Sequence, residues 1–197
     1  MEFYINGEKI DVTLENENTI GDVLQSFAKT CDENKAAVIG IQVNGTKITA
    51  DLFDGEAEKP LEKDTKFEFD VVTEDSIKES FGALAGFFDT LSEEVADVPN
   101  KFINGKISEA NEAIKKLADS IDQFCHIAAL ASLFPETFTN TKIADKTFND
   151  FFADFSPILS DFEAALQNED NVLVGDLCEY EICPRLKDIS QSLKETK

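Results

Sequence analysis

The chain has 197 residues, and its 40 Asp and Glu against 18 Lys and Arg give a net charge of −22 near pH 7. A surface of this sign repels the phosphates of DNA or RNA and the anionic headgroups of a membrane, so the composition argues against both as partners. With 42% hydrophobic residues, including 17 Phe, the chain can bury one or two cores and is not disordered.

The N-terminus and the cysteines predict a cytoplasmic protein. The chain does not open with a basic segment followed by an apolar one, and no uncharged apolar run approaches the roughly 18 residues that cross a bilayer. The four cysteines form no Cys-x-x-Cys pair, and we interpret them as reduced thiols. Cys178 and Cys183 are five residues apart, a spacing that places them on different faces of a helix.

The first segments predict a β-hairpin followed by a helix. Alternating apolar residues flank Asn6-Gly7, and these two residue types tolerate the positive φ angles of a tight two-residue turn. Thr19 then predicts the N-cap of a helix, because apolar residues recur with helical spacing over residues 20–28.

The next segments predict three more strands. A strand over residues 38–43 runs into a second Asn-Gly pair, Asn44-Gly45, which returns the chain into a short strand. A loop through Gly55 and Pro60 leads to a last strand over residues 66–72. One face of this strand carries Phe67, Phe69 and Val71.

The order hairpin, helix, strand, short strand, strand resembles the β-grasp fold, in particular the small sulfur carriers of thiamine and molybdopterin biosynthesis. The matching stretches are Ile5-Asn6-Gly7-Glu8, Thr19-Ile20-Gly21-Asp22-Val23-Leu24, Val43-Asn44-Gly45 and the closing strand. Those carriers act through a free C-terminal Gly-Gly, and this sequence contains no Gly-Gly. The resemblance therefore implies a ubiquitin-like recognition module that presents a sheet face or edge to a partner.

Residues 74–197 predict an antiparallel four-helix bundle, which makes the fold class α+β with domains 1–73 and 74–197. No Gly or Pro linker separates the halves, and Thr73 or Asp75 can cap the first helix. Four segments repeat apolar residues at alternating spacings of three and four, which predicts one buried seam per helix. The seams are Ile77, Phe81, Leu84, Phe88, Leu91 and Val95; Ile107, Ala110, Ile114, Leu117, Ile121, Phe124, Ala128 and Ala131; Phe148, Phe152, Phe155, Leu159, Phe162 and Leu166; and Ile182, Leu186, Ile189 and Leu193.

Two prolines predict interruptions in this half. Ser156-Pro157 can cap a new helix, so the third segment is expected to be two helices that meet at a bend. Pro184 removes a backbone donor and is expected to kink or break the last helix.

The third and early fourth segments carry the candidate partner-binding residues. Residues 147–184, which we call the acidic segment, contain nine acids and no base. Phe151 lies off the predicted seam, and it either widens the buried stripe or forms an exposed aromatic edge. Asp176, Glu179 and Tyr180 share one helix face, which is either a solvated face or a patch for a basic partner. The predicted partner-binding residues are Phe151, Asp154, Asp161, Asp176, Glu179 and Tyr180.

Catalytic and metal-binding patterns are missing, so we predict no catalytic residue, no cofactor and no metal. A di-iron bundle needs two Glu-x-x-His units, but the chain has one histidine, His126, which we expect to be packed or ion-paired. No Walker or Gly-x-Gly-x-x-Gly sequence occurs, and residues 168–171 lack the spacing of a calcium loop.

The sequence therefore predicts a non-enzymatic cytoplasmic protein that binds another protein with a basic surface, as an adaptor, assembly factor or chaperone-like partner. Residues 170–181 also resemble a segment of poorly characterised bacterial proteins encoded among motility genes. Two alternatives stay open. One is an acidic mimic that occupies the nucleic-acid groove of another protein, and the other is a carboxylate metal protein that uses the bundle core.

Overall fold

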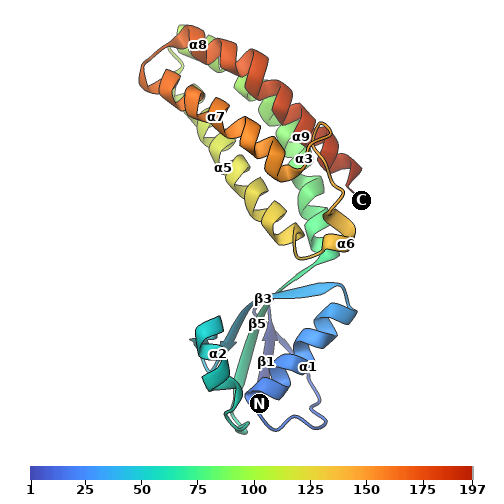
Figure 1. Ribbon diagram of the computed structural model, residues 1–197. Helices are drawn as coiled ribbons and strands as arrows, with labels where there is room; N and C mark the ends of the chain where they lie inside the picture. Colours follow the sequence, from blue (N-terminus) through green and yellow to red (C-terminus); the bar gives the residue numbers. More distant parts are fainter. Residues whose placement is uncertain (197) are drawn as a thin grey trace. The chain divides into compact units, whose positions relative to one another are not determined.

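A computed structural model describes residues 1–196 and has a mixed α+β fold (Figure 1). The chain divides into two compact units, unit 1 over Met1–Ser76 and unit 2 from Ile77 onward. Unit 1 contains a five-stranded sheet, and unit 2 is helical.

The strands of unit 1 follow the order β2-β1-β5-β3-β4 across the sheet. β1 and β5 pair in parallel, and the other neighbours are antiparallel. The first and last strands of the chain therefore lie side by side at the centre. The strands are β1 (Glu2–Ile5), β2 (Glu8–Ile10), β3 (Ala36–Val43), β4 (Thr46–Lys47) and β5 (Lys66–Thr73).

Both predicted Asn-Gly turns are confirmed. Asn6 and Gly7 have φ angles of 50° and 83°, and Asn44 and Gly45 have 51° and 78°. The Asn6 side chain also accepts a hydrogen bond from the Val71 N–H at 2.8 Å and donates one to the Val71 carbonyl at 3.0 Å. The first turn is thus fixed to the last strand by a residue that the turn geometry already requires.

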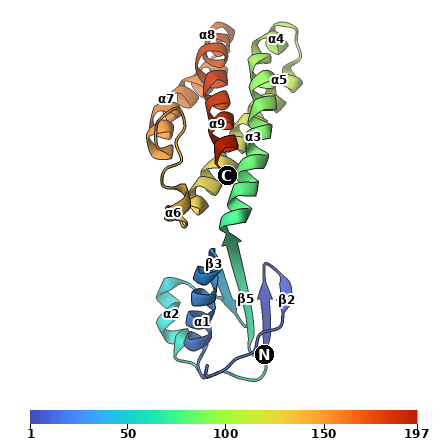
Figure 2. The ribbon, with the colours of Figure 1, turned by 90° about the vertical axis from the view of Figure 1, so that its right-hand side faces the viewer.

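Helix α1 (Ile20–Glu33) begins at the predicted cap and is longer than expected. The Thr19 hydroxyl accepts the Asp22 N–H at 3.2 Å, and the Asp22 carboxylate accepts the Thr19 N–H at 2.9 Å. This reciprocal capping box satisfies two backbone donors that the helix itself leaves unpaired. The apolar face of α1 covers one face of the sheet (Figure 2) and packs on Phe3, Phe67 and Phe69.

The loop predicted through Gly55 is wrong, because Ala50–Ala57 form helix α2. This helix buries none of its residues, so no apolar periodicity marks it in the sequence. Gly55, a residue of low helix propensity, was a further reason to predict a loop.

The change from sheet to helix occurs without a loop. β5 ends at Thr73, and α3 (Glu74–Ala96) begins at the next residue. The Thr73 hydroxyl accepts the Ser76 N–H at 3.0 Å, and the Ser76 hydroxyl accepts the Thr73 N–H at 3.0 Å. Thr73 is therefore the cap, as one of the two predicted alternatives.

Unit 2 contains long helical segments that lie side by side in Figure 1. Short helices join them at the two ends of the unit, with α4 and α8 at one end and α6 at the other (Figures 1 and 2). After α3 the elements are α4 (Val98–Ile103), α5 (Ile107–Ala131), α6 (Pro135–Phe138), α7 (Phe148–Gln167), α8 (Asn171–Asp176), the π-helical turn η1 (Leu177–Ile182) and α9 (Cys183–Glu195).

The predicted seams are confirmed in α3 and in η1–α9, where every seam residue is buried. In α5 the seam is confirmed in part: Ile107 is exposed, Ile114 and Ala128 are half-buried, and the other predicted seam residues are buried. In α7 the buried face is rotated toward Phe151 and Ala165. Phe155 and Phe162 are buried as predicted, but the other seam residues, Phe148, Phe152, Leu159 and Leu166, are only half-buried. The seam predicted for α7 is therefore partly wrong.

The bend predicted at Ser156-Pro157 is also wrong, because α7 continues through Pro157 as a single helix. A proline in a helix leaves the carbonyl four residues earlier, here that of Ala153, without its helical donor. Both Ala153 and Pro157 are exposed, so water can supply the missing hydrogen bond.

The turn η1 changes how the cysteines are placed. The Cys183 N–H donates to the carbonyl of Cys178, five residues earlier, so this turn is wider than an α-helical one. Residues five apart then lie on the same side, and both thiols are buried. The prediction of different faces is wrong, since it assumed α-helical spacing. Pro184 follows at the start of α9, where the break was expected.

Segments α3–α4 and α8–η1–α9 are antiparallel in one continuous register. The Ser190 hydroxyl donates to the Ala85 carbonyl at 2.8 Å, and the Cys183 thiol donates to the Ser92 carbonyl at 3.3 Å. Farther along, a methyl group at Gly175 would lie 3.6 Å from the Pro99 ring. Each step toward the N-terminus in one segment therefore matches a step toward the C-terminus in the other, up to α4 and α8.

The backbone conformation of Glu169, just after α7, indicates that glycine at this position would stabilise the protein. It has a φ of 54°, and the N–H groups of Glu169 and Asp170 bond back to the carbonyls of Leu166 and Ala165. Glycine is favoured at this left-handed position, so we expect Glu169→Gly to raise the free energy of unfolding by about 0.5–1 kcal/mol. Urea denaturation measures this. The same substitution inside the helix, Glu163→Gly, should lower it by about 1 kcal/mol, and an equal loss from both would contradict the prediction.

Candidate partner-binding surface

Phe151 does not form the exposed aromatic edge that was one of its two interpretations. It is buried, and its ring packs edge-on against those of Phe152 and Phe155, with distances between ring centroids of 5.6 Å and 5.8 Å. The rotation of α7 turns this side chain into the core, so Phe151 is removed from the candidate surface.

Asp154 and Asp161 are both exposed on α7, but they differ in their surroundings. The Asp154 carboxylate is ion-paired with Lys146, and this hydrogen bond and the lysine charge lower the pKa of Asp154. Within residues 1–196, Asp161 has no ion-pair or hydrogen-bond partner. Only Asp161 of the two therefore offers an uncompensated charge to a partner.

Asp176, Glu179 and Tyr180 lie together on the outer side of α8 and η1. All three are exposed, and Tyr180 keeps 63% of its surface accessible. The Glu179 carboxylate raises the pKa of Tyr180 by charge repulsion and by accepting a hydrogen bond, and Asp176 adds to this effect. Tyr180 therefore stays a neutral phenol at physiological pH, next to two carboxylates.

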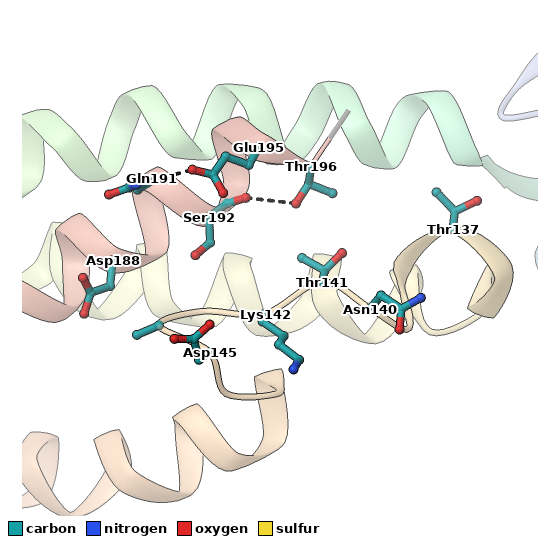
Figure 3. A pocket seen from close by; sticks show the side chains of 11 residues that line it. Thr137, Asn140, Thr141, Lys142, Asp145, Asp188, Gln191, Ser192, Glu195 and Thr196 are labelled. Atoms are coloured by element: carbon teal, nitrogen blue, oxygen red, sulfur yellow. Dashed lines mark hydrogen bonds between the residues drawn. The ribbon is translucent and has the colours of Figure 1, made fainter.

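A polar cavity of about 560 Å³ opens between α9, the end of α6 and the loop before α7 (Figure 3). Its lining contains hydroxyl and amide groups, three carboxylates and one ammonium group, and no aromatic ring. The residues are Thr137, Asn140, Thr141, Lys142, Ala144, Asp145, Asp188, Gln191, Ser192, Glu195 and Thr196.

Two carboxylates in this cavity have no partner. Asp145 on the loop and Asp188 on α9 form no hydrogen bond or ion pair with any residue of 1–196, whereas Glu195 accepts one from Gln191 at 3.3 Å. Ile143, which is fully buried, anchors the loop. These two acids could not be connected from the sequence, because 42 residues separate them and no local pattern links them.

A second cavity, of about 580 Å³, lies between α5, α6 and the start of α7. Small side chains such as Ala128 and Ala131 leave room beside the rings of Phe138, Phe148 and Phe152. The exposed thiol of Cys125 lines the same cavity.

The four free thiols should differ strongly in reactivity. Cys125 is exposed, although partial burial and the Asp122 charge raise its pKa. Burial raises the pKa of Cys178 to about 12, and Cys31 and Cys183 are also buried. We expect one thiol to react with a disulfide reagent in the folded protein, and the others at least about a hundredfold more slowly, since they react only from opened forms.

The measurement is a timed reaction with Ellman's reagent, with and without denaturant. Cys125→Ser is the matched variant and should remove the fast phase alone. A fast phase that persists in Cys125→Ser would show that a second thiol is accessible and would contradict the prediction.

The structure also bears on the single histidine, on metal binding and on membrane-spanning helices. His126 is exposed on α5 and forms no ion pair with another residue of 1–196, so the expectation that it is packed or ion-paired is wrong. It follows the buried Phe124 by two residues and therefore faces solvent. Across residues 1–196, no cluster of three or more His, Cys, Asp or Glu side chains could hold a metal ion. In the same part of the chain, no helix is both long and apolar enough to cross a membrane.

Two family models match separate parts of the chain. Residues 1–73 match the family described as TP0873 N-terminal domain, and residues 79–192 match the domain of unknown function DUF8042. The chain belongs to the DUF8042 family. It is 22% identical over 193 residues to a protein of Treponema pallidum (strain Nichols) described as "Uncharacterized protein", covering 98% of this chain and 96% of the relative. No solved structure gives a significant match.

Proposed function

We propose that this protein is a non-enzymatic, cytoplasmic binding protein whose helical unit takes a partner protein with a basic surface. The observation that carries the proposal is a surplus of exposed carboxylates without basic partners in unit 2. Asp161, Asp176 and Glu179 are of this kind. The exposed Asp145 and the half-buried Asp188 line one cavity and also have no basic partner among residues 1–196. Such charges repel one another and gain free energy when a cationic surface approaches.

The proposal also covers the fold of each unit. We propose that unit 1 is a β-grasp module, since β1 and β5 pair in parallel at the centre of a sheet that α1 covers. We propose that unit 2 is an antiparallel four-helix bundle, because α3 and α9 are antiparallel and the seams of the long helices are largely buried. Both are architectures that present surfaces for recognition, and neither requires a catalytic group.

The experiment compares the proteins retained from a cell extract by three immobilised forms of the full chain. They are the natural protein, a surface variant with Asp161→Asn, Asp176→Asn and Glu179→Gln, and a matched control. The control removes three exposed carboxylates of unit 1 through Asp11→Asn, Glu15→Gln and Asp32→Asn, so the change in net charge is the same.

We expect the natural protein and the control to retain the same basic protein, and the surface variant to lose it. Retention should weaken at about 0.5 M salt, where screening shortens the range of charge attraction to a few ångströms. If the surface variant retains what the control retains, the proposed function is wrong.

A further inference from the structure

One end of unit 2 exposes large apolar side chains that the core does not use. Ile103 is 77% exposed, Val172 76%, Ile107 57% and Leu173 41%. They lie at the end of α4, the start of α5 and the start of α8, and α4 and α8 lie at the same end of the unit (Figure 2). We call these four residues the end patch. Apolar surface grouped in this way marks interaction sites on soluble proteins.

The antiparallel register brings the two sides of the end patch together. Pro99 and Gly175 mark the level at which α4 contacts α8. Ile103 is four residues beyond Pro99, and Val172 is three residues before Gly175, so both lie about one helical turn farther out. The same spacings keep each side chain on the face of its helix that carries the contact. Two large apolar side chains thus lie at one level on neighbouring helices, yet each keeps about three-quarters of its surface accessible.

The charges around the end patch are uneven. On the α8 side, Glu169, Asp170, Asp176 and Glu179 are exposed, and none has an ion pair among residues 1–196. On the α4–α5 side, Lys101 and Lys106 are matched by acids of their own segments, Asp97 at 3.9 Å and Glu109 at 3.4 Å. The apolar centre is therefore bordered by uncompensated negative charge.

We propose that the end patch binds an amphipathic helix of a partner protein, with apolar residues on the face that meets Ile103 and Val172 and Lys or Arg along its flanks. This rests on the proposed function and names the kind of segment by which the basic partner is recognised. A helix supplies apolar side chains every three or four residues, which suits a short apolar site between two helix ends. Its flanking cations meet the carboxylates of α8 and η1, and Tyr180 beside them adds an aromatic contact.

The test uses a fluorescein-labelled synthetic peptide about five helical turns long, with Leu on one face and Lys on the others. A second peptide has the same composition in an order that breaks the apolar face. Fluorescence anisotropy with the full-length protein gives the Kd of each. The variants are Ile103→Ser with Val172→Ser, and the control is Leu133→Ser, an exposed leucine near α6 at the opposite end of the unit.

We expect the amphipathic peptide to bind at least about tenfold more tightly than the reordered one, and the double variant to remove that difference while the control keeps it. The substituted side chains are exposed, so circular dichroism of all variants should match the natural protein. Equal binding of the two peptides, or an unaffected double variant, would overturn the end patch. The proposed function would still stand after that result if the surface variant with Asp161→Asn, Asp176→Asn and Glu179→Gln lost the basic protein that the natural protein retains from the extract.

Analytical ultracentrifugation of the protein alone tests whether a second copy of this chain, rather than a partner helix, covers the end patch. A dimer of this chain that the double variant dissociates would mean that a second copy covers the end patch, and it would overturn the proposal. A monomer in both forms is the expected result.

Discussion

Phe124→Ala is expected to lower the free energy of unfolding of unit 2 by about 3–5 kcal/mol, the usual range for a buried Phe truncated in a core. Phe124 has no exposed surface, and its ring contacts those of Phe81, Phe88, Phe148 and Phe152, which come from α3 and α7. One substitution therefore opens a cavity where three helices meet. Urea denaturation followed by circular dichroism measures the loss.

Phe87→Ala is the matched control, because Phe87 lies next to the buried Phe88 on α3 but is itself exposed. We expect it to change the free energy of unfolding by less than about 0.5 kcal/mol, as is usual for surface positions. A similar loss for both variants would mean that the aromatic cluster around Phe124 does not hold the helices together.

Deletion of Glu179 from η1 is expected to be tolerated, whereas deletion of Lys187 from α9 should unfold or strongly destabilise unit 2. A π-helical turn contains one residue more than an α-helical turn, so removing an exposed residue there can restore a continuous α-helix with both flanks in place. Removing Lys187 instead rotates every later residue by about 100°. That rotation takes the buried Ile189 and Leu193 out of the core.

Thermal and urea denaturation of the two deletion variants measure the contrast. We expect the Glu179 deletion to cost at least about 3 kcal/mol less than the Lys187 deletion, which displaces two large core side chains. Since both delete one exposed charged residue, the comparison isolates helical phase. Equal losses would show that η1 cannot close into an α-helix.

The parts of the fold that the sequence predicted depend on local or strictly repeating signals. Asn6-Gly7 and Asn44-Gly45 require particular backbone angles, and the seams of α3 and α9 carry a large apolar residue at each expected position. Helix α2 was not predicted because none of its residues is buried, so it has no apolar periodicity. The π-helical turn η1 was not predicted because its one additional residue per turn leaves no signal in the types of residue present. In α7, adjacent Phe151 and Phe152 left the buried face ambiguous, and only packing decided it.

The candidate surface was predictable only where its residues are near in sequence. Asp176, Glu179 and Tyr180 were placed on one exposed face from their spacing, and the structure leaves all three exposed. Asp145 and Asp188 line one cavity because the loop before α7 lies beside α9, an arrangement that depends on tertiary packing. Likewise, Ile103 and Val172 meet through the register of two antiparallel segments, which no window of the sequence contains.

Thr73 has a consequence for any attempt to study the units separately. As the last residue of β5 it pairs with Ala36 on β3, and as the N-cap of α3 it exchanges hydrogen bonds with Ser76. A unit 2 fragment that starts after Thr73 lacks the N-cap of α3. A unit 1 fragment that ends at Thr73 lacks the Ser76 hydroxyl, which accepts the hydrogen bond from the Thr73 N–H. Because Thr73 belongs to both the sheet and the helix cap, fragments of the two units should both contain residues 73–76 rather than meet at a boundary.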